Sequence, residues 1–170
     1  MKLDRILVII DTQNDFITGP LGNKQAQEAV GRIVQKIREH EGFVYATMDT
    51  HSQNYLQTQE GQKLPVKHCM RGSDGWQLHK SIHLAVNAKP EHAVIEKHTF
   101  FATRVVTDLL CKCTAAEQEP EVIELCGVCT DICVMCNALL LKAFFPDTTI
   151  AVDASCCAGT TPENHQKALD

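Results

Sequence analysis

The fold is decided by the stretch Val122–Leu141, VIELCGVCTDICVMCNALLL. Its first residues form an apolar, partly β-branched run that is typical of a buried β-strand, and the apolar spacing that follows is helical. Cys133 falls in the first turn of the predicted helix. The partial positive charge and unpaired N–H groups of a helix N-terminus favour a thiolate and stabilise a developing oxyanion. The stretch therefore predicts a strand-to-helix turn with a cysteine nucleophile.

The segments on either side repeat this alternation of strand and helix. The continuous apolar run that ends at Ile10 predicts a central strand covered on both faces. Alternating strands and helices favour a parallel sheet between two helical layers. We therefore expect a single domain over residues 1–170 with a three-layer α/β/α, Rossmann-like architecture. The predicted strands are Arg5–Ile10, Phe43–Thr47, Ala93–Lys97, Glu121–Val128 and Thr149–Asp153, and the predicted helices are Gln25–His40, Trp76–Leu84, Arg104–Cys113, Thr130–Phe144 and a last one that opens with Thr161 and Pro162.

The composition disfavours several classes of protein. With 170 residues, 44% hydrophobic and 22% charged, the chain has the size of one globular domain. A formal net charge of −5 provides no basic surface for nucleic acid, so a small-molecule partner is expected instead. The apolar run before Asp11 is too short for a secretory or membrane-spanning segment. We expect a cytoplasmic protein without nucleic-acid or membrane partners.

Nine cysteines raise the question of disulfides or a metal site. Because the number is odd and several of them lie in or beside apolar segments, buried reduced thiols fit the pattern best. Cys129, Cys133 and Cys136 have a spacing that also allows zinc ligation, with Cys111 and Cys113 as further ligands. Zinc sites favour paired CxxC knuckles, so a cysteine zinc site is the less favoured alternative.

Three polar residues follow the ends of predicted strands, namely Asp11, Lys97 and Cys133. Ligands of open α/β sheets bind beyond the carboxyl ends of the strands. Taken singly, a turn-capping aspartate, a solvated lysine and a small core cysteine are commoner than catalytic residues. Their convergence on one edge of the sheet favours a functional site.

Four motifs, in this order, resemble the isochorismatase-like cysteine hydrolases, the family that includes nicotinamidases. They are DTQNDF at residues 11–16, EKHTF around Lys97, GVCTDICV at residues 127–134 and DASCCAGTTPENHQKAL near the C-terminus. The resemblance implies an isochorismatase-like fold and a catalytic triad of Asp11, Lys97 and Cys133. It also implies a cis peptide bond before Cys129 and an oxyanion hole formed by the N–H groups of Cys129 and Cys133.

In the chemistry that this resemblance implies, Cys133 attacks an amide carbonyl and forms a thioester. Asp11 takes the thiol proton, passes it to the leaving amine and then activates the hydrolytic water. Lys97 supplies a positive charge that favours the thiolate and carboxylate forms.

The long loop after the second predicted strand contains Asp49, His51 and His68, whose side chains are of types that bind divalent metals. Asp49 and His51 lie on one side of an extended segment, because alternate residues share a face. From spacing alone, solvated loop histidines are the commoner alternative. The resemblance to nicotinamidases implies that Asp49, His51 and His68 bind a divalent metal, with zinc expected, iron or manganese as alternatives, and Glu60 as a candidate fourth ligand.

The nicotinamidase subgroup also implies a substrate. Nicotinamide would be hydrolysed to nicotinate and ammonia, with Phe16 stacking on the pyridine ring. Pro65 departs from the subgroup, which commonly has a tryptophan at that position, and Trp76 lies too far along the chain to replace it. Cys129 is a second departure, since relatives commonly have a small residue such as alanine there.

Two alternatives remain open. One is another small-amide or N-carbamoyl hydrolase that keeps Asp11, Lys97 and Cys133 but binds no metal. The other is a non-catalytic, thiol-sensing member of the fold, suggested by the nine thiols and the adjacent pair Cys156 and Cys157.

Relatives commonly form dimers or tetramers, so we expect a homo-oligomer.

Overall fold

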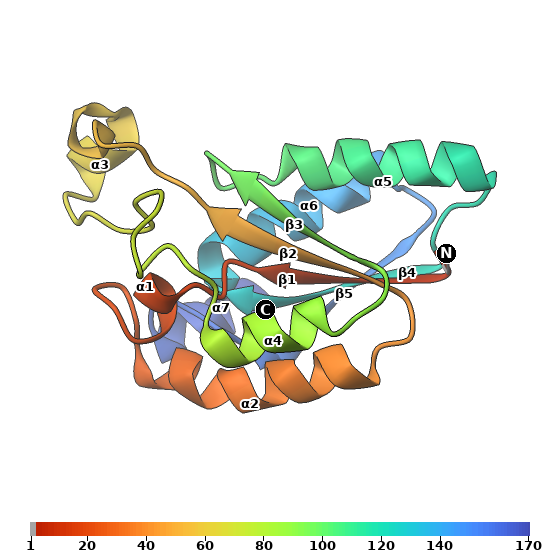
Figure 1. Cartoon of the computed structure of the whole chain (residues 1–170), viewed down its shortest axis with the longest axis horizontal. Helices are drawn as coiled ribbons and strands as arrows, with labels where there is room; N and C mark the ends of the chain where they lie inside the picture. Colours follow the sequence, from red (N-terminus) through yellow and green to blue (C-terminus); the bar gives the residue numbers. More distant parts are fainter. Residues whose placement is uncertain (1–2) are drawn as a thin grey trace.

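The computed structural model describes residues 3–170 and contains a central parallel sheet (Figure 1). The strands lie in the order β3-β2-β1-β4-β5, and every neighbouring pair is parallel. The carboxyl ends of the strands therefore meet at one edge, on the left of Figure 1. The strands are β1 (Arg5–Ile10), β2 (Phe43–Asp49), β3 (His92–Lys97), β4 (Val122–Val128) and β5 (Thr149–Ala158).

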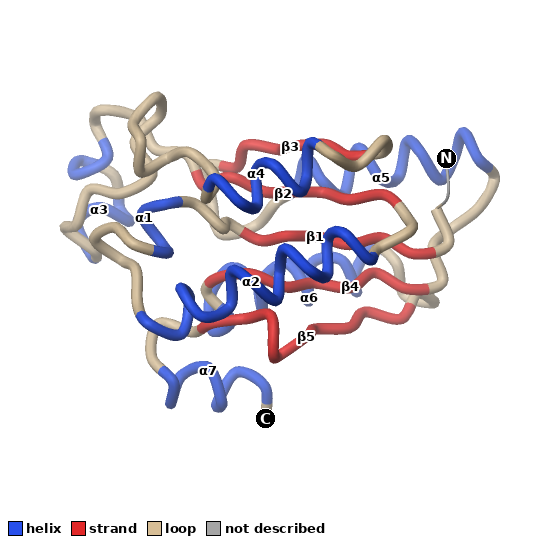
Figure 2. The backbone as a smooth tube through the Cα atoms, turned by 60° about the horizontal axis from the view of Figure 1, so that its bottom comes forward, coloured by secondary structure: helices blue, strands red, loops and turns tan. Residues whose placement is uncertain are grey.

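Helices cover both faces of the sheet. Figure 2 shows α2 (Lys24–Glu39) and α4 (Lys80–Asn87) in front of it, with α5 (Thr103–Ala116) and α6 (Met135–Phe144) behind. The predicted three-layer α/β/α architecture is confirmed. The shorter helical segments lie around the carboxyl edge and are α1 (Asn14–Ile17), a 3₁₀ turn (Tyr55–Gln57), α3 (Gln59–Lys63), a π-helical turn (Thr130–Val134) and α7 (Pro162–Leu169).

Burial on both faces explains the apolar run of β1. Its side chains from Ile6 to Ile10 are each at most 1% exposed. Burying one such side chain completely contributes about 1.5 to 3 kcal/mol to stability. This rigid central strand fixes the position of the residue that follows it, Asp11.

The sequence of α2 defines both its start and its buried face. Asn23 caps the helix, because its side chain accepts a hydrogen bond from Ala26 N at 2.9 Å. Ala26, Ala29, Ile33 and Ile37 are buried at helical spacing, so the helix packs on the sheet along one stripe.

The expected helix over Trp76–Leu84 is wrong in its first half. α4 begins only at Lys80, and Trp76 lies in a turn instead. Trp76 N donates to Ser73 Oγ at 3.2 Å, and Trp76 O accepts a hydrogen bond from Gln13 Nε2 at 2.8 Å. These bonds attach the turn to the end of β1 and compete with helix formation.

The last strand and last helix are also informative. β5 continues to Ala158, beyond its predicted end at Asp153, because pairing with β4 resumes after an irregularity. α7 begins as predicted, since Thr161 Oγ1 accepts a hydrogen bond from Asn164 N at 3.1 Å.

No helix within residues 3–170 is long and apolar enough to cross a membrane.

Candidate active site

Three strand ends bring Asp11, Lys97 and Cys133 together. Asp11 follows β1, Lys97 ends β3, and Cys133 lies in the π-helical turn after β4. Lys97 Nζ lies 2.7 Å from Asp11 Oδ2 and 3.6 Å from Cys133 Sγ. The three residues are nearly inaccessible, with exposed fractions of 0%, 4% and 6%. The structure thus places the three predicted residues in contact, while their catalytic roles stay predictions.

Asp11 is fixed by its backbone and by Thr47. Its φ of 47° lies in the left-handed region, which aspartate adopts more readily than most side chains. Thr47 Oγ1 donates to Asp11 Oδ1 at 2.7 Å and accepts a hydrogen bond from Asp11 N at 3.1 Å. The other carboxylate oxygen, Oδ2, is directed at Lys97.

Burial and neighbouring charges together control the protonation of Asp11 and Lys97. Burial raises the pKa of Asp11, and the charge of Lys97 only partly opposes the shift. Burial alone would lower the pKa of Lys97, but its electrostatic interactions with Asp11, Cys133 and Asp49 outweigh that effect, and the Lys97 pKa is raised. Lys97 is therefore an ammonium, and Asp11 accepts a proton more readily than an exposed aspartate.

The environment of Cys133 departs from the expectation of a helix-stabilised thiolate. Burial raises the pKa of Cys133 well above its usual value, Asp11 raises it further, and Lys97 only partly opposes both. Desolvation and the neighbouring carboxylates therefore favour the thiol form of Cys133. Cys133 is a thiol in the free protein, and its use as a nucleophile requires a base.

Cys129 directly precedes the turn. Its peptide bond with Val128 is cis, as the family resemblance implies. Cys129 O accepts hydrogen bonds from Ile132 N at 3.1 Å and Val134 N at 3.0 Å, which closes the π-helical turn. Burial raises the pKa of the Cys129 thiol to about 12. Cys129 lines the same cavity as Cys133. Because its pKa is raised, its thiol is protonated at neutral pH.

The other cysteines form no metal site with them. All nine cysteines are free, in agreement with the predicted reduced thiols. Within residues 3–170, the only group with candidate metal-ligand geometry contains histidines and carboxylates and no cysteine. The alternative of a zinc site built from Cys129, Cys133 and Cys136 finds no support.

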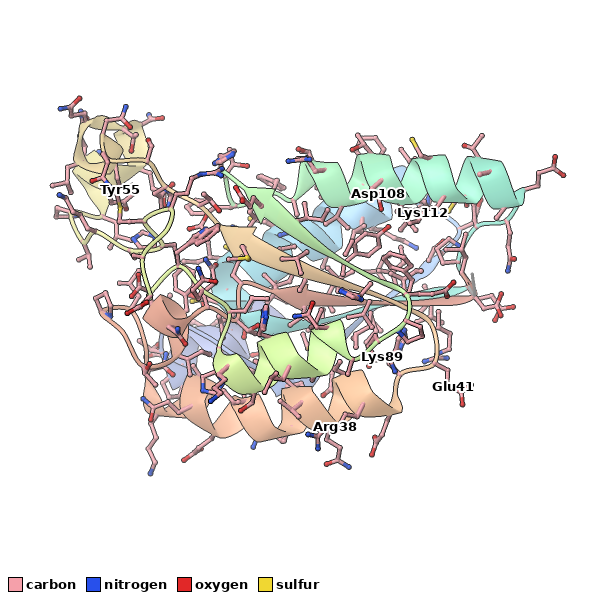
Figure 3. The ribbon with its side chains drawn as sticks, viewed as in Figure 1. Arg38, Glu41, Tyr55, Lys89, Asp108 and Lys112 are labelled. Atoms are coloured by element: carbon pink, nitrogen blue, oxygen red, sulfur yellow. The ribbon has the colours of Figure 1, made fainter. Side chains whose placement is uncertain are left out.

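Asp49, His51, Glu60 and His68 form this cluster, and their candidate ligand atoms all lie within 4.8 Å of one another. Asp49 Oδ2 lies 2.9 Å from His51 Nε2 and 3.6 Å from His68 Nε2. Glu60 Oε1 lies 3.6 Å and 3.9 Å from the same two nitrogens. Tyr55, labelled in Figure 3, packs against both imidazoles with ring centroids 4.5 Å and 5.1 Å away.

The chemistry of these donors fits a divalent metal. His68 Nδ1 bonds to Val66 O at 2.8 Å, which leaves Nε2 as the free lone pair. His51 Nε2 is buried without a hydrogen bond of suitable geometry. Burial raises the pKa of Asp49, but the adjacent imidazoles of His51 and His68 and the charge of Lys97 outweigh it and hold that pKa far below its usual range. Imidazoles with carboxylates suit zinc, iron or manganese.

A cavity of about 860 Å³ joins the two groups. Asp49, Glu60 and His68 of the cluster line it, and so do Cys129 and Cys133. The candidate metal ligands and the Cys133 thiol therefore share one cavity. The apolar walls are formed by Phe16, Leu21, Leu64, Phe100 and Ile132, and the Phe16 ring lies 5.5 Å from that of His68.

Two residues at the site escaped sequence reasoning. Phe100 lines the cavity, but it was not predicted as a site residue although it is the last residue of the EKHTF motif. Asn137 is buried beside the turn that carries Cys133. The available signal for Asn137 was a polar residue within an apolar helical run. Trp76 does not line the cavity, and its Nε1 donates to Thr50 Oγ1 at 2.9 Å.

The fold and the grouping of thiol, carboxylate and ammonium at the carboxyl edge define an α/β/α protein of the hydrolase type. A model of the isochorismatase domain matches residues 5–170. The chain therefore belongs to the isochorismatase family, which confirms the resemblance seen in the sequence.

Individual relatives agree with this assignment. A Bacillus subtilis (strain 168) protein described as an uncharacterized isochorismatase family protein, PncA, is 28% identical over 98% of this chain and 93% of its own length. The pyrazinamidase/nicotinamidase of Streptococcus mutans UA159 is 26% identical, with a TM-score of 0.78 over 97% of this chain and 93% of that chain.

Two more distant structures support the fold alone. The nicotinamidase PncA of Bacillus subtilis has a TM-score of 0.80 at 24% identity, covering 98% of this chain and 92% of that chain. The pyrazinamidase of Pyrococcus horikoshii, solved in complex with zinc, has a TM-score of 0.77 at 20% identity over 98% and 92% of the two chains.

Proposed function

We propose that this protein is a cysteine-dependent amidohydrolase that converts nicotinamide to nicotinate and ammonia. The observation that carries the proposal is the contact of Lys97 with both Asp11 and Cys133. Cys133 lines a cavity that Asp49 and His68 also line. The descriptions of the similar structures as nicotinamidases and pyrazinamidases support an amide C–N bond as the target.

Acylation begins with proton transfer from the Cys133 thiol to the Asp11 carboxylate. The sulfur then attacks the amide carbonyl carbon, and the negative oxygen is bound by the backbone N–H groups of Cys129 and Cys133. As the C–N bond breaks, Asp11 returns the proton to the leaving nitrogen and ammonia departs. The product of this half-reaction is a thioester on Cys133.

Deacylation uses the same groups in reverse. Asp11, again a carboxylate, takes a proton from water while the water oxygen attacks the thioester carbonyl. The C–S bond breaks, Asp11 gives the proton taken from water to the Cys133 sulfur, and the carboxylic acid leaves. The raised pKa of Asp11 supports its role as a carrier of protons in both halves. Lys97 stabilises the negative charge that alternates between Asp11 and Cys133.

Asp49, His51 and His68, with Glu60 as a fourth ligand, are proposed to bind a divalent metal. Bound zinc would supply a Lewis acid for the ring nitrogen of a pyridine substrate and so orient its carboxamide. The zinc in the similar Pyrococcus horikoshii structure supports this choice of metal. Phe16, packed on His68, is proposed to stack on the substrate ring. The cytoplasmic location and homo-oligomeric state stay predictions.

Ammonia release tests the proposed function. Purified protein is assayed against nicotinamide, pyrazinamide and an N-carbamoyl amino acid, both after chelation and with added zinc, iron or manganese. We expect turnover of the two heteroaromatic amides, strongest with metal. Turnover of the carbamoyl compound alone, unaffected by chelation, would instead favour the metal-free alternative, and inactivity on all three would favour a thiol sensor.

A further inference from the structure

The side chain of Asn137 is one of the most constrained polar groups in the molecule. Asn137 lies in α6 and is 1% exposed. Its Nδ2 donates to Cys133 O at 2.8 Å and to Phe100 O at 2.9 Å, and its Oδ1 accepts a hydrogen bond from Ala102 N at 2.6 Å. Both donor hydrogens and the acceptor are used, so the orientation of the amide is fixed.

These three bonds connect two segments that are distant in the sequence. One is the π-helical turn that holds the thiol, and the other is the segment from Lys97 to α5. Lys97 Nζ donates to Thr99 O at 3.1 Å within this second segment, and the next residue, Phe100, forms a wall of the cavity. Asn137 is thus a second direct polar link between the thiol turn and the segment after Lys97, beside the contact of Lys97 Nζ with Cys133 Sγ.

An amide at this position pairs with backbone groups of the loop that an apolar side chain would leave without a partner. α5 and α6 pack on the same face of the sheet, where an apolar side chain would bury without a desolvation cost. The amide instead bonds to the C=O of Phe100 and the N–H of Ala102, which flank one residue, as a neighbouring β-strand would. It thereby fixes a short loop segment that lacks a strand partner.

We propose that Asn137 is a positioning residue that sets the distance between the Cys133 thiol and Lys97 and holds Phe100 at the cavity wall. The kinetic part of this inference rests on the proposed amidohydrolase function, whereas the geometric part does not. Misplacement of reacting groups by about 1 Å can lower a rate by about 100-fold, so the loss of this link should affect turnover more than folding.

The test compares Asn137→Leu and Asn137→Asp with Thr148→Val. Leucine and aspartate approximate the size of asparagine, and neither a leucine side chain nor a carboxylate can donate to the carbonyls of Cys133 and Phe100. Thr148→Val is the matched control, because Thr148 is 2% exposed and its Oγ1 donates to Pro120 O at 2.7 Å, before the amino end of β5. Each protein is measured for its melting temperature, for kcat and KM, and for the rate at which iodoacetamide alkylates Cys133.

We expect all three variants to lower the melting temperature, but only the Asn137 variants to change the site. Their kcat should fall by about 10- to 100-fold with a smaller rise in KM, and alkylation of Cys133 should accelerate several-fold because the thiol turn is released. If Asn137→Leu does not fold, Asn137→Asp, which keeps the acceptor for Ala102 N, carries the comparison.

The result that overturns the inference is wild-type kcat and wild-type alkylation in an Asn137 variant whose melting temperature falls like that of Thr148→Val. A wild-type protein without amidase activity would refute the proposed function instead. In that case the alkylation rates still decide whether Asn137 positions Cys133, so the two failures are distinguishable.

Discussion

Asp49 Oδ1 lies 3.2 Å from Lys97 Nζ, while Oδ2 of the same carboxylate lies 2.9 Å from His51 Nε2. One side chain therefore contacts both the candidate triad and the candidate metal cluster. A charge change at Asp49 should affect both groups, whereas a change at His51 should affect only the metal cluster.

Asp49→Asn should weaken zinc binding by tenfold or more, since it replaces a charged ligand with a neutral one. It should also accelerate the alkylation of Cys133 in the metal-free protein, because the charge of Asp49 contributes to raising the pKa of that thiol. Metal titration and peptide-level mass spectrometry measure the two effects.

His51→Ala should weaken zinc binding to a similar degree while leaving the alkylation of metal-free Cys133 unchanged. His83→Ala, on the exposed surface of α4, is the control that should change neither property. Equal zinc affinity in His51→Ala and His83→Ala would contradict the assignment of the cluster as a metal site.

The reactivity of Cys133 should depend on pH in a defined direction. Because its pKa is raised, the thiolate fraction is small at neutral pH and grows about tenfold per pH unit up to the pKa. Alkylation of the metal-free protein should therefore still be accelerating above pH 9, where an ordinary cysteine approaches its plateau. A plateau below pH 8 would mean that Lys97 and the helix end outweigh burial.

Thr47→Val should lower kcat by about tenfold, since it removes a hydrogen bond to the charged carboxylate of Asp11 without changing the side-chain shape. Steady-state ammonia release measures the effect. Thr107→Val on the exposed face of α5 serves as the control. If the two variants have the same kcat, Thr47 does not position the base.

The backbone conformation and close packing of Gly127 lead to a prediction about stability. Its φ is 123°, and an added Cβ would lie 2.2 Å from Ile10 O, at the point where β4 pairs with β1. Gly127→Ala should therefore lower the free energy of unfolding by more than about 1 kcal/mol.

Gly31→Ala provides the opposite case for the same chemical change. An added Cβ at Gly31 meets no atom within 4 Å, and the residue lies in the middle of α2. We expect stabilisation by up to about 1 kcal/mol, because alanine has the higher helix propensity. Urea denaturation of both variants measures the contrast, and equal effects would contradict the predicted clash at Gly127.

Much of the fold could be predicted because its signals are local. The β1 run and the spacing of α2 are patterns that burial imposes directly on the sequence. The turn around Trp76 was mispredicted because it depends on hydrogen bonds to Ser73 and to the distant Gln13. Long-range bonds of this kind leave no periodic signal.

The site was predictable only in part. Strand ends located Asp11, Lys97 and Cys133, since parallel strands bring such residues to one edge. The protonation of Cys133 was not predictable, because it depends on desolvation that only the packed structure defines. Asn137 was not predicted for a related reason: its three hydrogen-bond partners are backbone atoms, whose positions only the packed structure defines.

The most direct test of the central claim is ammonia release from nicotinamide by the wild type, Cys133→Ala and Cys136→Ala. Cys136 lies one helical turn after Cys133 but does not line the cavity, so its substitution controls for the loss of a nearby thiol. We predict that Cys136→Ala retains wild-type turnover and that Cys133→Ala loses at least about 1,000-fold in kcat. Turnover by Cys133→Ala within tenfold of the wild type would contradict the account.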